Sequence, residues 1–275
     1  MDTFQWNLKS RDGLELSACC WKPENPKAVV VLIHGHGEHT QRYLHVANAF
    51  TQAGYALQSF DLRGHGQSAG QRGHTPNYDS LMGDIADFIV DAQKRFSGLP
   101  VFLYGHSMGG NQVINYSLRS PQELKGVIAT GPWLKLAFDP PAAQILMAKL
   151  LNNIAPSFSL SSGLSQTALS RDPDVVSKYA ADPLVHDKIS VRLYTSMYGN
   201  GFWALEHAGE LKIPMLLMHG SADKLTSAQA SQEFARKAGN LVTLRIWDGF
   251  YHEIHNEPEK IEVIQTMVDW LDHHI

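Results

Sequence analysis

The sequence predicts an α/β fold with a mostly parallel central sheet that is covered by helices on both faces. Apolar runs of strand length alternate along the chain with segments whose apolar residues repeat at helical spacing. The run at residues 28–33 is rich in β-branched residues and uninterrupted, as suits a strand buried on both faces. The chain has 275 residues, 44% of them hydrophobic and 18% charged, which is a globular composition near the size limit of one continuous core.

The first elements follow from short apolar runs and turn signals. Residues 4–8 and 14–21 are strand-like, and the Asp-Gly pair at 12–13 between them is typical of a β-hairpin. The run at 28–33 is the first strand expected inside the parallel sheet. Helix-like sequence follows from about residue 43 to residue 52.

The rest of the chain repeats the same alternation. Further strands are expected at residues 55–60, 101–104, 124–129, 215–218 and 241–246. Further helices are expected at residues 79–96, 109–119, 228–237 and 258–274. In the last helix, Ile261, Ile264, Val268 and Leu271 fall on one face.

The alternation is interrupted between about residues 133 and 211. This stretch holds a Pro-Pro pair at 140–141 and an apolar, helix-like run at 145–151. We expect residues 1–132 and 212–275 to form the α/β core, and residues 133–211 to form a cap, or lid, inserted over the sheet. The apolar run fits either the interior of the cap or an exposed face that rests on a lipid surface.

Charge and cysteine content exclude several classes of protein. The net charge of −4 and the lack of a Lys/Arg run leave no basic surface for nucleic acid. Cys19 and Cys20 are adjacent and would point to opposite faces of a strand, so we expect no disulfide between them. With no secretory signal and no apolar run near the roughly 20 residues that span a bilayer, a cytoplasmic location is expected, with room for peripheral contact with a membrane.

A glycine-flanked serine follows the strand expected at 101–104. Residues 105–109 read Gly-His-Ser-Met-Gly, and a helix is expected to begin at the second of these glycines. The pattern G-x-S-x-G needs this context, because a sharp strand-to-helix turn strains the serine backbone and exposes its hydroxyl at the sheet edge. The helix N-terminus favours negative charge that develops there. We therefore interpret Ser107 as a nucleophile rather than as a chance serine in a Gly-rich turn.

A nucleophilic serine needs a base, and the base needs a carboxylate to orient it. In this type of fold the acid and then the histidine follow the serine in chain order. Asp223 comes just after the strand expected at 215–218, and His252 just after the one expected at 241–246. Both positions lie past strand C-termini, where ligands collect in open α/β sheets.

Each partner has a competing interpretation. Asp223 could cap the helix expected at 228–237, but Ser227 can perform that task. Asp248 is a rival carboxylate, which is disfavoured because it lies so close to the histidine in sequence. His255 is the rival histidine, three residues after His252. We expect Asp223 and His252 to act with Ser107.

The strand expected at 28–33 ends in the segment His-Gly-His-Gly-Glu-His at 34–39. One interpretation is a metal site, because H-x-H-x-E-H resembles the ligand run of metallo-β-lactamase-type hydrolases. The other is an oxyanion loop whose backbone N–H groups point at the reacting carbonyl. A metal site would need further ligands on a different fold and would leave residues 105–109 unexplained. We favour the oxyanion loop, with the N–H groups of His36 and Met108 as donors, and expect no metal and no cofactor.

Taken together, these segments resemble the monoacylglycerol lipases and the related lysophospholipases, which are α/β-hydrolases. The resemblance rests on residues 34–43, 60–68, 105–110, 219–223 and 251–255. It runs from about Val29 to the C-terminus and is weakest in the insertion. It implies the α/β-hydrolase fold and a monoester of glycerol as substrate.

The resemblance also implies which residues hold the polar head of the substrate. They match Glu38, Arg42 and His255, together with Tyr179 in a Y-x-x-D-P-L segment. A glycerol head offers hydroxyls, and a glutamate can accept their hydrogen bonds. From the residues alone, Glu38 and Arg42 also fit an i,i+4 surface ion pair worth a few tenths of a kcal/mol. The Asp-Leu-Arg-Gly-His-Gly segment at 61–66 is expected to be a structural, glycine-rich turn.

The sequence therefore predicts a serine hydrolase that cleaves monoacylglycerol to fatty acid and glycerol through an acyl-enzyme on Ser107. Lysophospholipase, short-acyl carboxylesterase and aminopeptidase of a related fold are alternative enzymes. An aminopeptidase should need a carboxylate cluster for the free amine, and Glu38 alone is thin evidence for one. A non-catalytic lipid-binding scaffold is a remote alternative, because all three catalytic residue types are intact.

Overall fold

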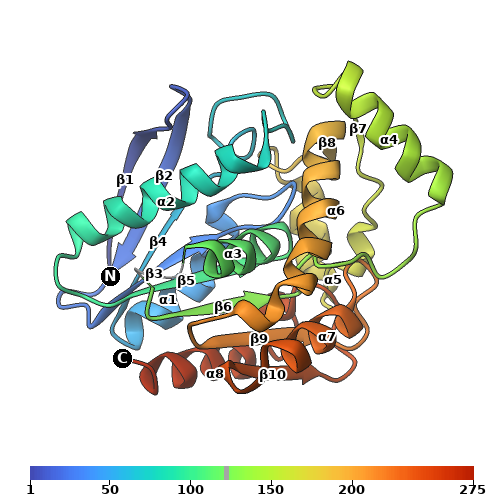
Figure 1. The fold of residues 1–275 in the computed structure, drawn as a ribbon. Coiled ribbons are helices and arrows are strands. Elements are labelled where there is room, and N and C mark those ends of the chain that lie inside the picture. The colour runs from blue at the N-terminus through green and yellow to red at the C-terminus, as the bar shows by residue number, and fades with distance from the viewer. Residues whose placement is uncertain (121–123) are drawn as a thin grey trace.

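The computed structural model describes residues 1–120 and 124–275, and at its centre lies an eight-stranded sheet (Figure 1). The strands lie in the order β1-β2-β4-β3-β5-β6-β9-β10. Their bounds are β1 (Asp2–Lys9), β2 (Glu15–Lys22), β3 (Ala28–Ile33), β4 (Tyr55–Phe60), β5 (Val101–His106), β6 (Gly126–Thr130), β9 (Met215–Gly220) and β10 (Val242–Trp247). The strands from β4 to β10 in this order run parallel, and β1 and β2 form an antiparallel hairpin. The mostly parallel sheet is confirmed.

Helices cover both faces of this sheet, as expected (Figure 1). On one face, α1 and α8 enclose a core that includes Phe50 and Trp270. On the other face, α2, α3, α6 and α7 enclose a second core that includes Phe88 and Phe234. The helix bounds are α1 (Leu44–Gln52), α2 (Tyr78–Arg95), α3 (Met108–Arg119), α4 (Ala142–Ile154), α5 (Pro173–Ala181), α6 (Val191–Glu206), α7 (Ala228–Ala238) and α8 (Lys260–Asp272). Short 3-10 helices lie at η1 (Thr40–Tyr43), η3 (Gln166–Ala168), η4 (Ala208–Glu210), η5 (Gly239–Leu241) and η6 (Ile254–Asn256).

The four apolar residues on one face of the last helix differ in their burial. Ile261 is 78% exposed in the first turn of α8. The contact of α8 with the core begins at Val263 and Ile264, so its first turn extends past the buried surface. Val268 and Leu271 are buried. Helical spacing of apolar residues alone does not reveal where along a helix its packing begins.

The two cysteines of β2 are free, as predicted. Because neighbouring residues of a strand point to opposite faces, Cys19 belongs to the core under α1 and α8, and Cys20 to the core under α2 and α3. Burial raises the pKa of each thiol to about 12. Each cysteine therefore acts as a small apolar core residue.

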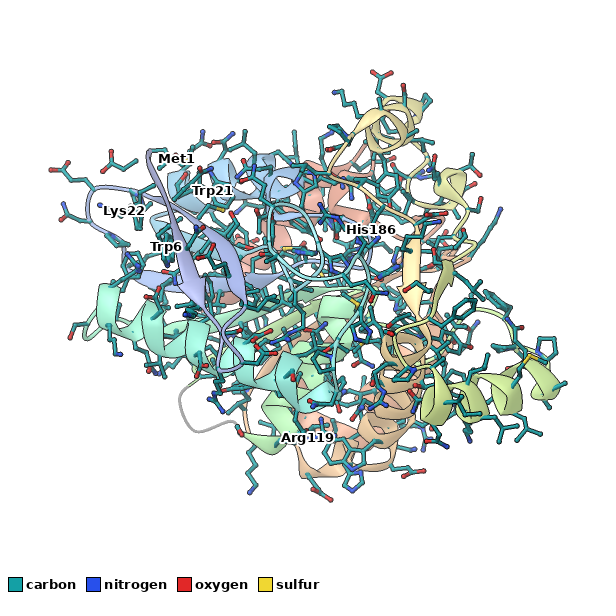
Figure 2. The ribbon with its side chains drawn as sticks, turned by 90° about the horizontal axis from the view of Figure 1, so that it is seen from above. Met1, Trp6, Trp21, Lys22, Arg119 and His186 are labelled. Carbon is teal, nitrogen blue, oxygen red and sulfur yellow. The ribbon has the colours of Figure 1, made fainter. Side chains whose placement is uncertain are left out.

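The segment between β6 and β9 leaves the sheet and returns to it. Helix α4 has no buried residue and lies at the opposite edge of the molecule from the hairpin that carries Trp6 and Lys22 (Figure 2). A two-stranded sheet of β7 (Ser159–Ser161) and β8 (Lys188–Ser190) precedes α6. Helix α6 packs into the core beside α3 through residues such as Met197. In the described part of the chain, no helix is long and apolar enough to cross a membrane.

The parallel strands place four loops at one edge of the sheet. The loops after β3, β5, β9 and β10 begin at the carboxyl ends of those strands, which meet at the same edge. Ile33 at the end of β3 lies opposite Gly105 near the end of β5. Trp247 at the end of β10 lies opposite Gly220 at the end of β9. Residues that are far apart in sequence are thereby brought together.

The turn at residues 61–66 has a structural role, as expected. The Arg63 side chain is 4% exposed and donates two hydrogen bonds to Asp84 of α2, at 2.7 and 2.8 Å. A further bond of 2.9 Å joins Arg63 to Asp12 in the β1–β2 turn. One guanidinium therefore fastens the hairpin and the β4 loop to α2.

We predict that Asp84→Ala lowers the free energy of unfolding by about 3 kcal/mol, because it leaves Arg63 buried with only Asp12 as partner. Urea denaturation measures this. The control is Asp87→Ala on the same helix, where the partner Arg11 is 68% exposed, and the expected loss is under about 1 kcal/mol. Equal losses in the two variants would contradict the role given to Arg63.

Candidate active site

Ser107 stands at the turn from β5 into α3. Among the described residues it is the one non-glycine residue with a positive φ, at 54°, with ψ at −112°. Its N–H donates to the Thr130 carbonyl oxygen at 2.9 Å, and its own carbonyl oxygen accepts from Trp133 N–H at 2.9 Å. These backbone bonds to the β6 end hold the strained conformation in place.

Glycines flank the serine because the chain is too close for side chains. A Cβ on Gly105 would lie 2.3 Å from the Gly109 carbonyl oxygen. A Cβ on Gly109 would lie 2.1 Å from the Ile33 carbonyl oxygen of β3. The G-x-S-x-G spacing is therefore a packing requirement of this turn.

The structure brings the three expected residues into one hydrogen-bonded line. Ser107 Oγ lies 2.9 Å from His252 Nε2. His252 Nδ1 lies 2.7 Å from Asp223 Oδ2. With Nδ1 donating to the carboxylate, Nε2 is free to accept the serine proton. This is the geometry in which a histidine can act as general base toward a hydroxyl.

The side chain of Asp223 is fully buried, and both of its carboxylate oxygens accept hydrogen bonds. Its Oδ1 accepts the backbone N–H groups of Leu225 and Thr226 at 2.7 and 3.0 Å. Its Oδ2 also lies 3.0 Å from His219 Nε2 and 2.9 Å from Thr226 Oγ1. Burial by itself raises the pKa of Asp223, but the charge of His252 and the bonds from both histidines hold that pKa well below its usual range. The carboxylate therefore stays charged beside the imidazole.

His252 is buried but ready to accept a proton. Burial lowers the pKa of His252, and the Asp223 carboxylate outweighs that effect, so the pKa is raised above the ordinary value of 6.5. The ring of His106 lies beside it at a centroid distance of 4.8 Å. Burial, and then the charge of His252, lower the pKa of His106 to about 4, so His106 stays neutral.

The rival residues occupy other places. Asp248 is exposed and accepts a bond from Ser221 Oγ at 3.1 Å. His255 is completely buried and stacks on Tyr43 at a centroid distance of 4.8 Å. Ser227 caps α7 by accepting the Ala230 N–H, as proposed for it from the sequence.

The loop at residues 34–39 passes beside the serine. A Cβ on Gly35 would lie 3.3 Å from the Cβ of Ser107. Neither His36 N–H nor Met108 N–H has a hydrogen-bond partner among the described residues. The Met108 N–H belongs to the first turn of α3, where no intrahelical acceptor exists. Two free donors next to a serine hydroxyl can stabilise an oxyanion.

The histidines of this loop do not converge on a common point. His34 Nδ1 lies 2.7 Å from the Gly35 carbonyl oxygen, and its Nε2 accepts the Leu62 N–H at 2.9 Å. His39 Nε2 lies 2.8 Å from Asp182 Oδ2. Burial lowers the pKa of His36 to about 3, so its ring is neutral. No group of three or more His, Cys, Asp or Glu side chains in residues 1–120 and 124–275 is arranged to hold a metal ion.

Glu38 and Arg42 pair with each other, but they are not a surface pair. Arg42 Nη1 donates to Glu38 Oε2 at 2.6 Å, and the two side chains are 10% and 3% exposed. Arg42 also donates two bonds of 2.7 Å to Glu253. Glu38 Oε1 accepts the Gly35 N–H and the Tyr43 hydroxyl at 2.6 and 2.7 Å. Burial raises the pKa of Glu253, but Arg42 outweighs it and lowers that pKa to about 2.

Of the four residues expected at the substrate head group, the structure places Glu38 on the pocket wall. The Arg42 guanidinium lies over the Tyr179 ring at 4.6 Å. Tyr179 lines a neighbouring hollow together with His186. His255 lies in the core, and neither of its ring nitrogens has a hydrogen-bond partner among the residues that the structure describes.

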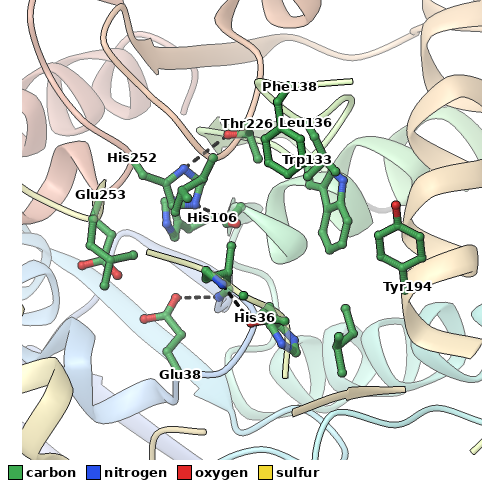
Figure 3. A pocket seen from close by; sticks show the side chains of 18 of the residues that line it. His36, Glu38, His106, Trp133, Leu136, Phe138, Tyr194, Thr226, His252 and Glu253 are labelled. Carbon is green, nitrogen blue, oxygen red and sulfur yellow. Dashed lines mark hydrogen bonds between the residues drawn. The ribbon is translucent and has the colours of Figure 1, made fainter. Parts of the chain in front are cut away.

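The pocket above Ser107 has a polar end and an apolar end. Figure 3 shows Glu38 and Glu253 on one side, and Trp133 and Tyr194 on the other. The apolar lining comes mostly from the segment between β6 and β9, and its residues are Trp133, Leu136, Phe138, Pro140, Leu164, Leu169, Ile189 and Tyr194. Such a pocket fits a molecule with a polar head and a long apolar tail.

Sequence reasoning missed two residues that the structure places at the site. Glu253 lines the pocket directly after His252 and bonds to Arg42. Thr226 lines the pocket and lies 3.3 Å from His252 Nδ1. Glu253 carries no local signal, because its partner Arg42 lies 211 positions away in the sequence. Thr226 carries no signal in the sequence that sets it apart from a turn residue.

Comparison with known proteins shows the family to which the chain belongs. Residues 24–259 match the family described as serine aminopeptidase, S33. A protein of Dictyostelium discoideum, described as an uncharacterised abhydrolase domain-containing protein, is 36% identical over 98% of the chain, which spans 29% of that protein's length. The monoacylglycerol lipase of Mycolicibacterium smegmatis is 35% identical over 96% of this chain and 95% of its own length.

Two further similar proteins match this chain over nearly the whole length of both chains. Phospholipase YtpA of Bacillus subtilis is 35% identical over 93% of this chain and 99% of its own. The crystal structure of Paleococcus ferrophilus monoacylglycerol lipase superimposes with a TM-score of 0.86, at 35% identity, over 100% of both chains. The chain therefore belongs to the serine aminopeptidase S33 family, and its fold is that of an α/β-hydrolase.

Proposed function

We propose that this protein hydrolyses carboxylic esters of lipids, with monoacylglycerol as its substrate and fatty acid and glycerol as products. The observation that carries the proposal is the line from Ser107 through His252 to Asp223, which opens into a pocket with one polar and one apolar end. Relatives of similar length that are named as monoacylglycerol lipases support it.

The reaction follows from the positions of the donors and acceptors. His252 Nε2 takes the proton of Ser107 as the oxygen attacks the ester carbonyl. Asp223 holds the imidazole through Nδ1 and stabilises its charged form. The N–H groups of His36 and Met108 receive the oxyanion. His252 then protonates the leaving alcohol, and a water that it activates releases the fatty acid from Ser107.

Each end of the pocket matches one end of the substrate. The acyl chain lies among the apolar side chains near Trp133 and Tyr194. The glycerol hydroxyls face Glu38. Arg42 lies behind Glu38, Tyr179 packs on the Arg42 guanidinium, and His255 lies deeper, against Tyr43. A carboxylate that faces the pocket favours hydroxyl donors.

The charge of the polar end separates this substrate from its rivals. Glu38 and Glu253 carry two negative charges against the single positive charge of Arg42, so an anionic phosphate head would meet like charge. An α-amino group would need free carboxylates, but Arg42 already binds both of these. A lysophospholipid remains the second candidate, because YtpA is named as a phospholipase.

Residues 133–211 are proposed as a cap that meets lipid. Helix α4 carries a cluster of exposed apolar side chains at Leu146, Met147, Leu150 and Ile154, which are 57–81% exposed. Helix α6 anchors the segment in the core. An exposed apolar helix beside the mouth of a lipid pocket fits reversible contact with a membrane surface.

Ser107→Ala should retain the fold and lose ester hydrolysis, with kcat falling by a factor on the order of 10⁶. Circular dichroism and the melting temperature check the fold, and fatty acid release from monolauroylglycerol checks the activity. Ser221→Ala is the control, because that serine lies in a neighbouring loop and bonds to Asp248. Full activity of Ser107→Ala would refute the mechanism.

A substrate panel should rank monolauroylglycerol above lysophosphatidylcholine, and lysophosphatidylcholine above lysophosphatidic acid. The reason is the net negative charge at the polar end of the pocket, and each step is expected to exceed about tenfold in kcat/KM. Acetyl and butyryl esters in the same panel test the short-acyl alternative. A preference for lysophosphatidylcholine would overturn the head-group assignment.

Ile154→Ser should weaken binding to phosphatidylcholine vesicles by about tenfold, because it removes one large apolar side chain from the proposed contact. Co-sedimentation measures the binding. Ile261→Ser is the matched control, since that isoleucine is 78% exposed on α8, against 81% for Ile154 on α4. Equal effects of the two substitutions would contradict a role for the cap in binding.

A further inference from the structure

Two loops of the active site are joined through one side chain. The first loop, residues 34–39, carries the proposed oxyanion donor His36. The second loop, residues 251–256, carries His252 and Glu253. They leave the sheet after β3 and β10, which are separated in it by β5, β6 and β9. Arg42 lies between them and hydrogen-bonds to a carboxylate from each.

The contacts of Arg42 leave it little capacity to bind a substrate. Its Nη1 donates to Glu38 and Glu253, its Nη2 donates to Glu253 at 2.7 Å, and its side chain is 10% exposed. The Tyr179 ring packs on its guanidinium, with Arg42 Cζ 4.6 Å from the ring centroid. A guanidinium held in this planar, bidentate way is fixed in position.

Each of the two carboxylates belongs to one of these loops and makes further hydrogen bonds that fix the position of that loop. Glu38 Oε1 accepts the N–H of Gly35 at 2.6 Å, and Gly35 directly precedes His36. Glu253 directly follows His252, its N–H donates to the Leu169 carbonyl oxygen, and its Oε2 accepts from Asn256 Nδ2 at 2.8 Å. Movement of Arg42 would therefore be transmitted to both loops.

We propose that Arg42 is a positioning residue, which fixes the oxyanion loop relative to the His252 loop through Glu38 and Glu253, and that it does not bind the substrate head group. The inference rests on the proposed function for the roles of His36 and His252. It differs from the expectation drawn from the resemblance, which put Arg42 in contact with the head group.

Glu38 and Glu253 also contribute to the electrostatic potential at His252. The titratable groups around this ring are Asp223 from the β9 loop, His106 from β5, Glu38 from the β3 loop, and Glu253 and His255 from its own loop. His219 of β9 bonds to Asp223. Glu253 and Glu38 both favour the protonated form of His252. Loss of one negative charge should therefore lower the pKa of His252 and extend activity to lower pH.

The first test compares two esters of one fatty acid, monolauroylglycerol and methyl laurate, in Arg42→Gln. A positioning role predicts that kcat falls about 10- to 100-fold on both esters with little change in KM, because small misplacement of reacting groups is costly. Arg42→Lys keeps the charge but not the planar fork, so it should recover melting temperature more fully than kcat. Arg11→Gln, which breaks an exposed ion pair, is the control.

A head-group role predicts a different result. Arg42→Gln would then raise KM for monolauroylglycerol and leave methyl laurate unaffected. That outcome would overturn the proposal. Unchanged kinetics on both esters in a folded Arg42→Gln would overturn it too.

Labelling of Ser107 by a fluorophosphonate separates this inference from the proposed substrate. The probe has no glycerol head, and its rate reports the serine, the base and the oxyanion donors alone. The labelling rate of Arg42→Gln should fall about 10- to 100-fold even if the wild type cleaves neither ester. An unchanged labelling rate would refute the positioning role, whereas a wild type that labels but cleaves neither ester would refute only the proposed function.

The second test uses the pH profile of labelling. In the wild type the rate should fall as the pH drops through the raised pKa of His252, because the base must be neutral. Glu253→Gln should move this acid limb down by about 0.5 to 1 pH unit. Glu259→Gln, which removes a charge whose side chain is 43% exposed, should leave the limb in place. An acid limb that stays in place, or moves up, in Glu253→Gln would overturn the role given to Glu253.

Discussion

The left-handed backbone of Ser107 is the constraint on which the rest of the site depends. The tight turn that holds this positive φ needs glycine two residues before and two residues after the serine, because Gly105 and Gly109 allow the chain to approach itself and β3. The turn puts the hydroxyl at the sheet edge and the first N–H of α3 beside it. The other functional groups of the site are arranged around that hydroxyl by the loops of the neighbouring strands.

The charged groups around His252 favour its protonated form. Three buried carboxylates, of Asp223, Glu38 and Glu253, surround the histidine loop, and Arg42 is bonded to two of them. The nearby histidine His106 is neutral because burial lowers its pKa. The pKa of His252, which is bonded to both a serine and a carboxylate, is instead raised above its ordinary value. Burial and pairing together select which group takes the proton.

The sequence revealed those features whose causes are local. The strand at 28–33 is an apolar run, and the turn at Ser107 shows its glycines, so both could be recognised directly. Asp223 and His252 followed from their places after strands. Glu253 was missed, because its bond to Arg42 joins residues 211 positions apart, and nothing local marks it. His255 was expected near the head group, and its depth in the core depends on how Tyr43 and His106 pack around it.

The two buried thiols make the protein convenient for labelling chemistry. Only the thiolate reacts with maleimides and similar reagents, and burial keeps Cys19 and Cys20 both protonated and out of reach. A cysteine introduced on α4 would therefore be the single reactive thiol of the folded chain, since the sequence holds only these two cysteines. A fluorophore there would report the approach of the helix to a lipid surface without any change to the native core.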